Sequence, residues 1–173
     1  MDNSIIILFL PLVAFFYQIL FGKILGSKTH YVSLAIIGLM FLLCLNYFLQ
    51  IFDSNSLGPM LDVSGTWFST GSFTLELGIF IDNITAIMLM VVSLISFLVH
   101  LYSTAYMEGD PRYSRYFAFL GLFTFSMNGI VLSNSLVMMY LFWELVGLSS
   151  YLLIGFWFEK DSAANASKKA FLT

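Results

Sequence analysis

Charged side chains are scarce in this sequence. Of its 173 residues, seven are Lys or Arg and ten are Asp or Glu, so 10% are charged while 60% are hydrophobic. An ordinary soluble domain covers its core with about 25% charged residues, and this composition excludes that class. Together with a mean hydropathy of +0.92, it predicts a chain that lies in a lipid bilayer.

Residues that bind metals or perform covalent catalysis are also rare. Cys44 is the only cysteine, which excludes a disulfide within the chain, and the two histidines are far apart in sequence. The sequence contains no nucleophile triad, no phosphate-binding glycine loop and no dinucleotide-binding motif. The net charge of −3 is spread over the connections, so it indicates no nucleic-acid partner. We expect no metal and no cofactor in this chain.

Long apolar stretches recur along the chain, and a helix of about 20 residues is long enough to cross a membrane. The sequence predicts an all-α polytopic membrane protein with helices at Ile5–Phe21, Tyr31–Phe52, Ile84–Tyr106, Tyr116–Leu132 and Leu136–Phe158. An alanine-rich segment predicts that a sixth helix begins near Ser162. Because the sequence stops at Thr173 without a cap, we expect a fragment whose sixth helix is incomplete.

Polar residues inside the spans predict contacts between helices. Pro11 leaves one backbone carbonyl of the first span without its donor, and a neighbouring helix can satisfy it. Ser126 and Asn128 in the fourth span are expected to form hydrogen bonds between helices. Lining of a water path is the alternative role for these two residues.

The basic residues predict the orientation of the chain, because cytoplasmic connections carry an excess of Lys and Arg. All seven follow the first, third and fifth spans: Lys23, Lys28, Arg112, Arg115, Lys160, Lys168 and Lys169. The opposite side carries only acids, namely Asp2, Asp53, Asp62, Glu76 and Asp82. We therefore expect an outward N-terminus and a cytoplasmic or matrix-facing loop after the fifth span.

The long connection between the second and third spans predicts a β-hairpin. Residues 73–81 alternate between apolar and polar side chains, and Thr70–Ser72 provides a turn after Thr66–Phe68. We expect this hairpin on the outer surface, where it packs over helix ends or touches a neighbouring subunit.

Glu144 is the residue most indicative of function. It lies eight residues into the fifth span, where an ionised acid costs about 2.5 to 3.5 kcal/mol on the insertion scale. Helical spacing places it on one face with Tyr140, Gly147 and Tyr151, and we expect that face to be internal. A carboxyl there is a candidate proton carrier, with a fixed structural hydrogen bond as the alternative.

Three other residues are weaker candidates for proton translocation. His100 lies near the cytoplasmic end of the third span and titrates near neutral pH, so it is a candidate relay or a packing residue. Lys168 and Lys169 on the sixth helix are candidates for the end of a proton-entry path, or for contact with lipid headgroups.

Several runs of sequence resemble the large antiporter-like, proton-translocating membrane subunit of respiratory complex I (NADH:quinone oxidoreductase). The similarity covers most of the chain from about Trp67 onward, while the first two spans are similar mainly in hydropathy. The runs that carry it are Ile81–Ala86, His100–Ser103, Tyr106–Met107, Tyr113–Phe117, Trp143–Phe156 and Lys169–Phe171.

The resemblance implies a role in coupling electron transfer from NADH to quinone to proton pumping. It implies that Glu144 matches a family glutamate that works with a lysine on a later, broken helix beyond this chain. NADH and quinone would be used elsewhere in the complex, and the expected partners are other membrane subunits, especially a neighbouring antiporter-like one. The expected location is the bacterial inner membrane, with the mitochondrial inner membrane as the alternative.

Related families share the same motifs. The large subunit of a multisubunit cation/proton antiporter and a membrane-bound hydrogenase subunit are alternatives, and a scaffold without its own ion path is a third. In each case the chain divides into the first two helices (1–52), an outward loop with the hairpin (53–82) and the start of the antiporter-like domain (83–173).

Overall fold

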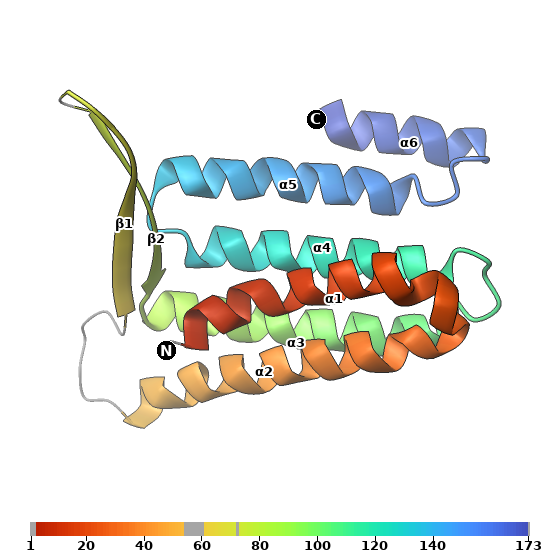
Figure 1. Ribbon diagram of the computed structural model, residues 1–173, viewed down its shortest axis with the longest axis horizontal. Helices are drawn as coiled ribbons and strands as arrows, with labels where there is room; N and C mark the ends of the chain where they lie inside the picture. Colours follow the sequence, from red (N-terminus) through yellow and green to blue (C-terminus); the bar gives the residue numbers. More distant parts are fainter. Residues whose placement is uncertain (1–2, 54–60, 72, 173) are drawn as a thin grey trace.

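A computed structural model describes residues 3–53, 61–71 and 73–172. In these ranges the chain forms six α-helices, one short 3-10 helix and one two-stranded sheet (Figure 1). The elements are α1 Asn3–Leu25, η1 Gly26–Thr29, α2 His30–Asp53, β1 Leu61–Thr70, β2 Phe73–Ile81, α3 Asn83–Tyr106, α4 Tyr113–Leu132, α5 Leu136–Ile154 and α6 Asp161–Leu172.

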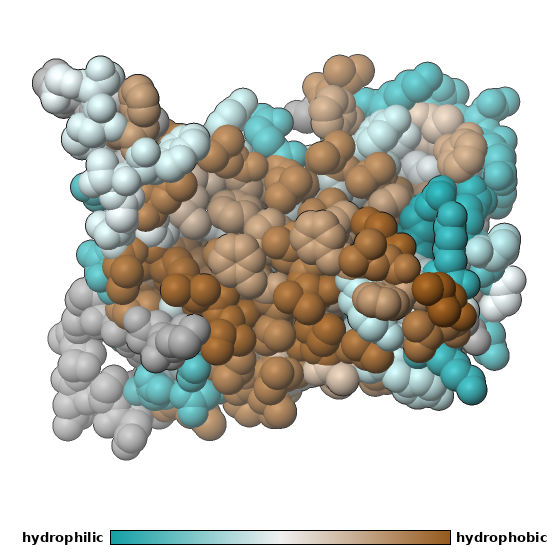
Figure 2. All heavy atoms as spheres, in the orientation of Figure 1, coloured by the Kyte–Doolittle hydropathy of each residue, from teal (hydrophilic) through white to brown (hydrophobic). Residues whose placement is uncertain are grey.

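Helices α1 to α5 are long and apolar enough to cross a membrane. They run side by side along the long axis of the molecule, and the connections alternate between its two ends (Figure 1). Hydrophobic side chains gather over the middle of the helices, and hydrophilic ones lie toward the ends (Figure 2). This confirms the prediction of an all-α polytopic membrane protein.

The first four long helices form the packed part of the molecule. Helix α1 packs against α2 and α4, and α3 packs against α2 and α4. Helix α5 lies at the side of this group against α4, and α6 folds back along α5 (Figure 1). The buried side chains at the centre include Ile7, Leu8, Ile37, Met40, Leu89 and Leu132.

The predicted end of the fifth span was wrong. Helix α5 ends at Ile154, whereas the apolar run predicted a helix to Phe158. The N–H of Phe156 bonds a carbonyl three residues back, at 3.3 Å, and its ring is buried against Tyr116 of α4 with centroids 5.3 Å apart. Hydropathy continues past Gly155 because the turn buries Phe156 against α4.

A hydrogen bond between helices compensates for Pro11. Because Pro11 has no N–H, the carbonyl of Ile7 lacks its helical donor. The Nδ2 of Asn128, a fully buried residue of α4, donates to that carbonyl at 3.3 Å. This confirms the role expected for Asn128. The prediction for Ser126 was wrong, since its hydroxyl donates to the carbonyl of Leu122 in its own helix at 2.8 Å.

We predict that Asn128→Ala lowers the free energy of unfolding by about 1 kcal/mol, the usual size of a hydrogen bond between membrane helices. In a Pro11→Ala background the cost should shrink, because an alanine at position 11 supplies the missing N–H to Ile7. Unfolding of both single variants and the double variant in detergent measures this coupling. Equal costs in the two backgrounds would contradict the assignment.

Side chains at the end of the molecule that carries the hairpin fix where helices begin. The Asp82 carboxylate accepts a hydrogen bond from the N–H of Thr85 at 2.8 Å and caps α3. That backbone hydrogen bond holds the pKa of the Asp82 carboxyl below its usual value. Ser135 caps α5 in the same way through the N–H of Met138.

The predicted hairpin is present, and its first strand is longer than expected. Strands β1 and β2 pair antiparallel from Leu61 opposite Ile81 onward, with a bulge between Thr66 and Phe68. The turn contains Gly71 at φ +55°, a conformation that favours glycine. Ser72, predicted as part of this turn, lies outside the described residues.

The base of the hairpin is anchored on the helices. Ile79 and Ile81 are buried in the central cluster, and the N–H of Asn134 donates to the carbonyl of Gly78 at 3.3 Å. Farther along β1, Trp67 and Phe68 are exposed. The base of the hairpin therefore packs over the helix ends, which is the first of the two roles predicted for it.

Candidate functional site

Glu144 lies near the middle of α5. It is eight residues after Leu136 and ten before Ile154, so about 12 Å and 15 Å of helix separate it from the two ends. A helix that crosses a hydrocarbon layer of about 30 Å places this carboxyl near the bilayer centre.

The face of α5 that carries Glu144 is not covered by the described part of the chain. Glu144 is exposed there, and a Cβ added at Gly147 would meet no heavy atom within 4 Å. About half of the residues in the apolar part of α4 are buried, whereas in α5 only 11% are buried. The expectation that this face is internal therefore remains a prediction about contacts beyond the described residues.

Tyr140 is the immediate polar neighbour of Glu144. It lies one helical turn earlier on the same face, and its hydroxyl interacts electrostatically with the Glu144 carboxylate. Both side chains are exposed within this chain. The pair presents an acid and a hydroxyl toward the uncovered side of α5.

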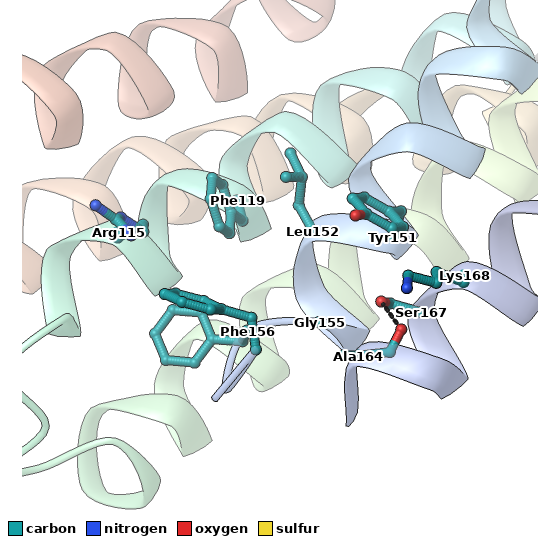
Figure 3. A pocket seen from close by; sticks show the side chains of 10 residues that line it. Arg115, Phe119, Tyr151, Leu152, Gly155, Phe156, Ala164, Ser167 and Lys168 are labelled. Atoms are coloured by element: carbon teal, nitrogen blue, oxygen red, sulfur yellow. Dashed lines mark hydrogen bonds between the residues drawn. The ribbon is translucent and has the colours of Figure 1, made fainter. Parts of the chain in front are cut away.

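Helix α6 brings Lys168 close to the end of this face. Helix α6 folds back beside α5. Lys168 is seven residues after Asp161, the first residue of α6, which corresponds to about 10 Å along the helix axis. It lines a cavity of about 270 Å³ together with Tyr151 (Figure 3). It also lines a second cavity, of about 350 Å³, with Leu148 and Tyr151. Tyr151 is two turns from Glu144, and Glu144 itself lines neither cavity.

The close approach of α6 depends on Gly155. A Cβ at this position would lie 3.0 Å from the Oγ of Ser167. Ser167 is itself buried, and its hydroxyl donates to the carbonyl of Ala164 at 2.9 Å. The small residue at the end of α5 thus sets the path that carries Lys168 back along the helix.

His100 lies apart from the Glu144 face. It is on α3, with 1% of its surface exposed, and its ring packs against Phe117 of α4 with centroids 6.0 Å apart. Its Nδ1–H donates to the carbonyl of Ser96 at 2.8 Å. The Nε2 atom is buried and has no hydrogen-bond partner among the described residues. Helix α4 lies between this histidine and α5.

Lys169 does not join Lys168. It is exposed on α6, and it lines neither of the two cavities along α5. Of the four predicted proton-translocation residues, the structure therefore places Lys168 toward the Glu144 face and leaves His100 and Lys169 elsewhere.

A buried polar cluster near the basic end went unrecognised in the sequence. Gln18 of α1 is 2% exposed, and its Nε2 donates to the hydroxyl of Ser33 at 2.6 Å and to the carbonyl of Thr29 at 3.1 Å. An amide inside the first apolar stretch was the available signal. In the described ranges, no group of three or more His, Cys, Asp or Glu residues could hold a metal ion.

Comparison with known families gives two adjacent matches. Residues 67–117 match the family described as NADH-Ubiquinone oxidoreductase (complex I), chain 5 N-terminus. Residues 133–173 match the family described as NADH:quinone oxidoreductase/Mrp antiporter, TM. The second segment contains Glu144 and Lys168.

Individual relatives agree with these matches. The chain is 45% identical over 152 residues to NAD(P)H-quinone oxidoreductase subunit 5, chloroplastic, from Mesostigma viride, covering 87% of this chain and 23% of the relative. It is 52% identical over 107 residues to NAD(P)H-quinone oxidoreductase chain 5 from Synechocystis sp., covering 62% and 16%. For subunit 5, chloroplastic, from Marchantia polymorpha, the identity is 39% over 175 residues, covering 95% and 25%.

A solved structure shares the fold. A chain of the membrane-bound sulfane sulfur reductase, an archaeal respiratory membrane complex, superimposes with a TM-score of 0.83 at 19% identity, covering 99% of this chain and 34% of that one. The chain spans about a quarter or less of the length of the curated relatives described above.

Both family matches and the identities to these relatives show that the chain belongs to the chain 5 family of antiporter-like membrane subunits of complex I.

Proposed function

We propose that this chain is part of the proton-translocating membrane subunit of a NAD(P)H:quinone oxidoreductase, in which electron transfer to quinone drives proton movement. The observation that carries the proposal is Glu144, a carboxyl near the middle of a membrane span on a face with a tyrosine hydroxyl beside it. The names of the chain 5 relatives support the parent reaction.

The proposed mechanism uses Glu144 as a proton carrier. A buried carboxyl is favoured in its neutral form, whereas a nearby cation favours the ionised form. A cation that approaches and withdraws would therefore make Glu144 release and take up a proton. The proposed cation is a lysine from sequence beyond this chain, and Lys168, Lys169 and His100 are proposed to supply protons to the path.

The proposed assembly is a multisubunit membrane oxidoreductase with other membrane subunits as partners, including a neighbouring antiporter-like one. This chain would hold no redox cofactor, and NAD(P)H and quinone would be used by other subunits. The proposed location is the bacterial inner membrane. The mitochondrial inner membrane is one alternative, and the chloroplastic relatives add a chloroplast membrane as another.

A cation/proton antiporter is the second candidate, because the family matched by residues 133–173 also includes Mrp antiporters. Membrane vesicles that contain the full-length protein in its complex distinguish the two. NAD(P)H and quinone should drive proton movement, and a sodium gradient alone should not. Proton movement that follows the sodium gradient and ignores NAD(P)H would favour the antiporter. NAD(P)H-driven movement that Glu144→Gln leaves unchanged would favour a scaffold.

The proposed orientation places the N-terminus and the hairpin outside. The α1–α2, α3–α4 and α5–α6 connections, which hold Lys28, Arg112 and Lys160, share one end of the molecule with Lys23 in the last turn of α1 (Figure 1). Under the positive-inside rule this end faces the cytoplasm or matrix. Residues 1–52 would then be the two leading helices, 53–82 the outward loop and 83–173 the start of the transport domain.

Cysteine labelling tests this orientation. In a Cys44→Ser background, Ser69→Cys on β1 should react with a membrane-impermeant maleimide only from the outer side. Pro111→Cys should react only from the cytoplasmic side, because it lies in the α3–α4 connection. The reverse pattern would invert the topology. Ser56, another position in the predicted outward loop, lies outside the described residues.

A further inference from the structure

Two adjoining cavities lie where α1 ends and α4 begins. Their volumes are about 350 and 340 Å³, and both are lined by Lys23 of α1 and by Ser114 and Arg115 of α4. The two helices meet closely here, because the Ser114 hydroxyl donates to the carbonyl of Gly22 at 3.0 Å. Lys23 and Arg115 therefore face a common space from opposite helices.

The other charged groups at this place are already engaged. One Asp110 oxygen accepts from the N–H of Arg112 at 2.7 Å, and the other accepts from the Nε1 of Trp157 at 3.1 Å. The Arg112 guanidinium pairs with Glu159 at 3.3 Å and lies over the Phe156 and Phe158 rings.

Lys23 and Arg115 remain available to a ligand. Within the described ranges neither forms a salt bridge, and both are exposed. Arg115 also lines the 270 Å³ cavity along α5, where it lies at the end away from Lys168 (Figure 3). The cavities at the α1–α4 junction thus present three basic side chains, of which Arg112 is paired with Glu159, and one carboxylate that is already hydrogen-bonded.

An apolar groove continues from these two cations toward the middle of the membrane. The second cavity is also lined by Ile19, Ala118 and Phe119, and by Gln18, whose amide nitrogen is hydrogen-bonded within the protein. Ile19 is 51% exposed. Lys23 is two residues from the end of α1, and Arg115 is the third residue of α4. The cations therefore lie at the membrane boundary, and the apolar side chains lie on the membrane side of them.

We propose that this junction binds an anionic phospholipid, with its phosphate between Lys23 and Arg115 and an acyl chain along Ile19 and Phe119. Basic pockets between helix ends on the cytoplasmic or matrix side suit anionic headgroups, because Arg and Lys are good phosphate donors. A free phosphate would use the cations but would leave the adjoining apolar groove unfilled. The positive end of α4 adds a smaller attraction for the phosphate.

Photocrosslinking in the full complex tests the proposal. The probe is phosphatidylglycerol with a diazirine in its acyl chain, and the readout is crosslinked peptide that contains Ile19 or Phe119. Unlabelled phosphatidylglycerol should compete, whereas phosphatidylcholine and inorganic phosphate should not. Lys23→Gln and Arg115→Gln should each lower the yield about fivefold, as expected for removing one cation near an anionic headgroup.

Lys28→Gln is the matched control, because Lys28 is exposed at the same end but lines neither cavity. Lys23→Arg and Arg115→Lys should keep most of the yield, and they remain informative if the neutral variants assemble poorly. Equal competition by phosphatidylcholine, effective competition by phosphate, or an equal loss in Lys28→Gln would each overturn the proposal. So would the absence of crosslinks in the unmodified complex.

Discussion

Replacing Glu144 by glutamine is expected to leave the complex assembled and to stop most of the proton movement through this subunit. Glutamine keeps the size of the side chain and can still accept a hydrogen bond from Tyr140, but it cannot carry a proton. Positioned proton-transfer groups contribute about 10² or more to the rates they control. We therefore expect the rate of proton transfer through this subunit to fall by about tenfold or more. Protons moved per electron should fall by this subunit's share, and electron transfer should slow where the two processes are tightly coupled.

The measurement is proton translocation per electron in vesicles that contain the full-length variant, with assembly checked separately. Glu76→Gln is the matched control, because Glu76 is an exposed acid on the hairpin strand β2. Glu144→Asp keeps a titratable carboxyl and should retain more activity than Glu144→Gln. An unchanged ratio and rate in the assembled Glu144→Gln complex would show that Glu144 has only a structural role.

The spans and the hairpin were predictable because each rests on a local pattern. Apolar runs of about 20 residues give the five long helices, and period-two alternation gives β2. Pro11 was also informative, since a proline within a span requires an outside donor. The sequence alone did not identify Asn128 as that donor, because the pairing depends on how α1 and α4 pack.

The errors and omissions come from packing between elements. The end of α5 was misplaced because Phe156 is buried by turning toward α4, and hydropathy does not record that direction. The return of α6 along α5, which brings Lys168 to Tyr151, likewise has no local signal. Glu144 could be recognised as a candidate site because it lies in the middle of an apolar span. Which residues pack against its face of α5 depends on contacts outside the described residues.

Gly129 is expected to be essential for the docking of α5 on α4. A Cβ added at Gly129 would overlap the ring of Phe142 on α5, and that ring packs edge-on against Phe125 with centroids 5.4 Å apart. Gly129→Ala gains at most about 1 kcal/mol in helix propensity, whereas overpacking of this kind costs about 1 to 3 kcal/mol. The overlap involves an aromatic ring held by a second ring, so we expect the overpacking cost to dominate.

We therefore expect Gly129→Ala to lower the free energy of unfolding by about 1 to 2 kcal/mol in detergent and to reduce proton movement, because α4 is the long helix that supports α5 and Glu144. Gly65→Ala is the control, since its added Cβ would meet nothing closer than 3.9 Å. Phe142→Ala removes the overlapping ring. The double variant should therefore lose less stability than the sum of the two single losses. Additive losses would show that Gly129 and Phe142 do not compete for the same space, and that the packing of α5 on α4 has another basis.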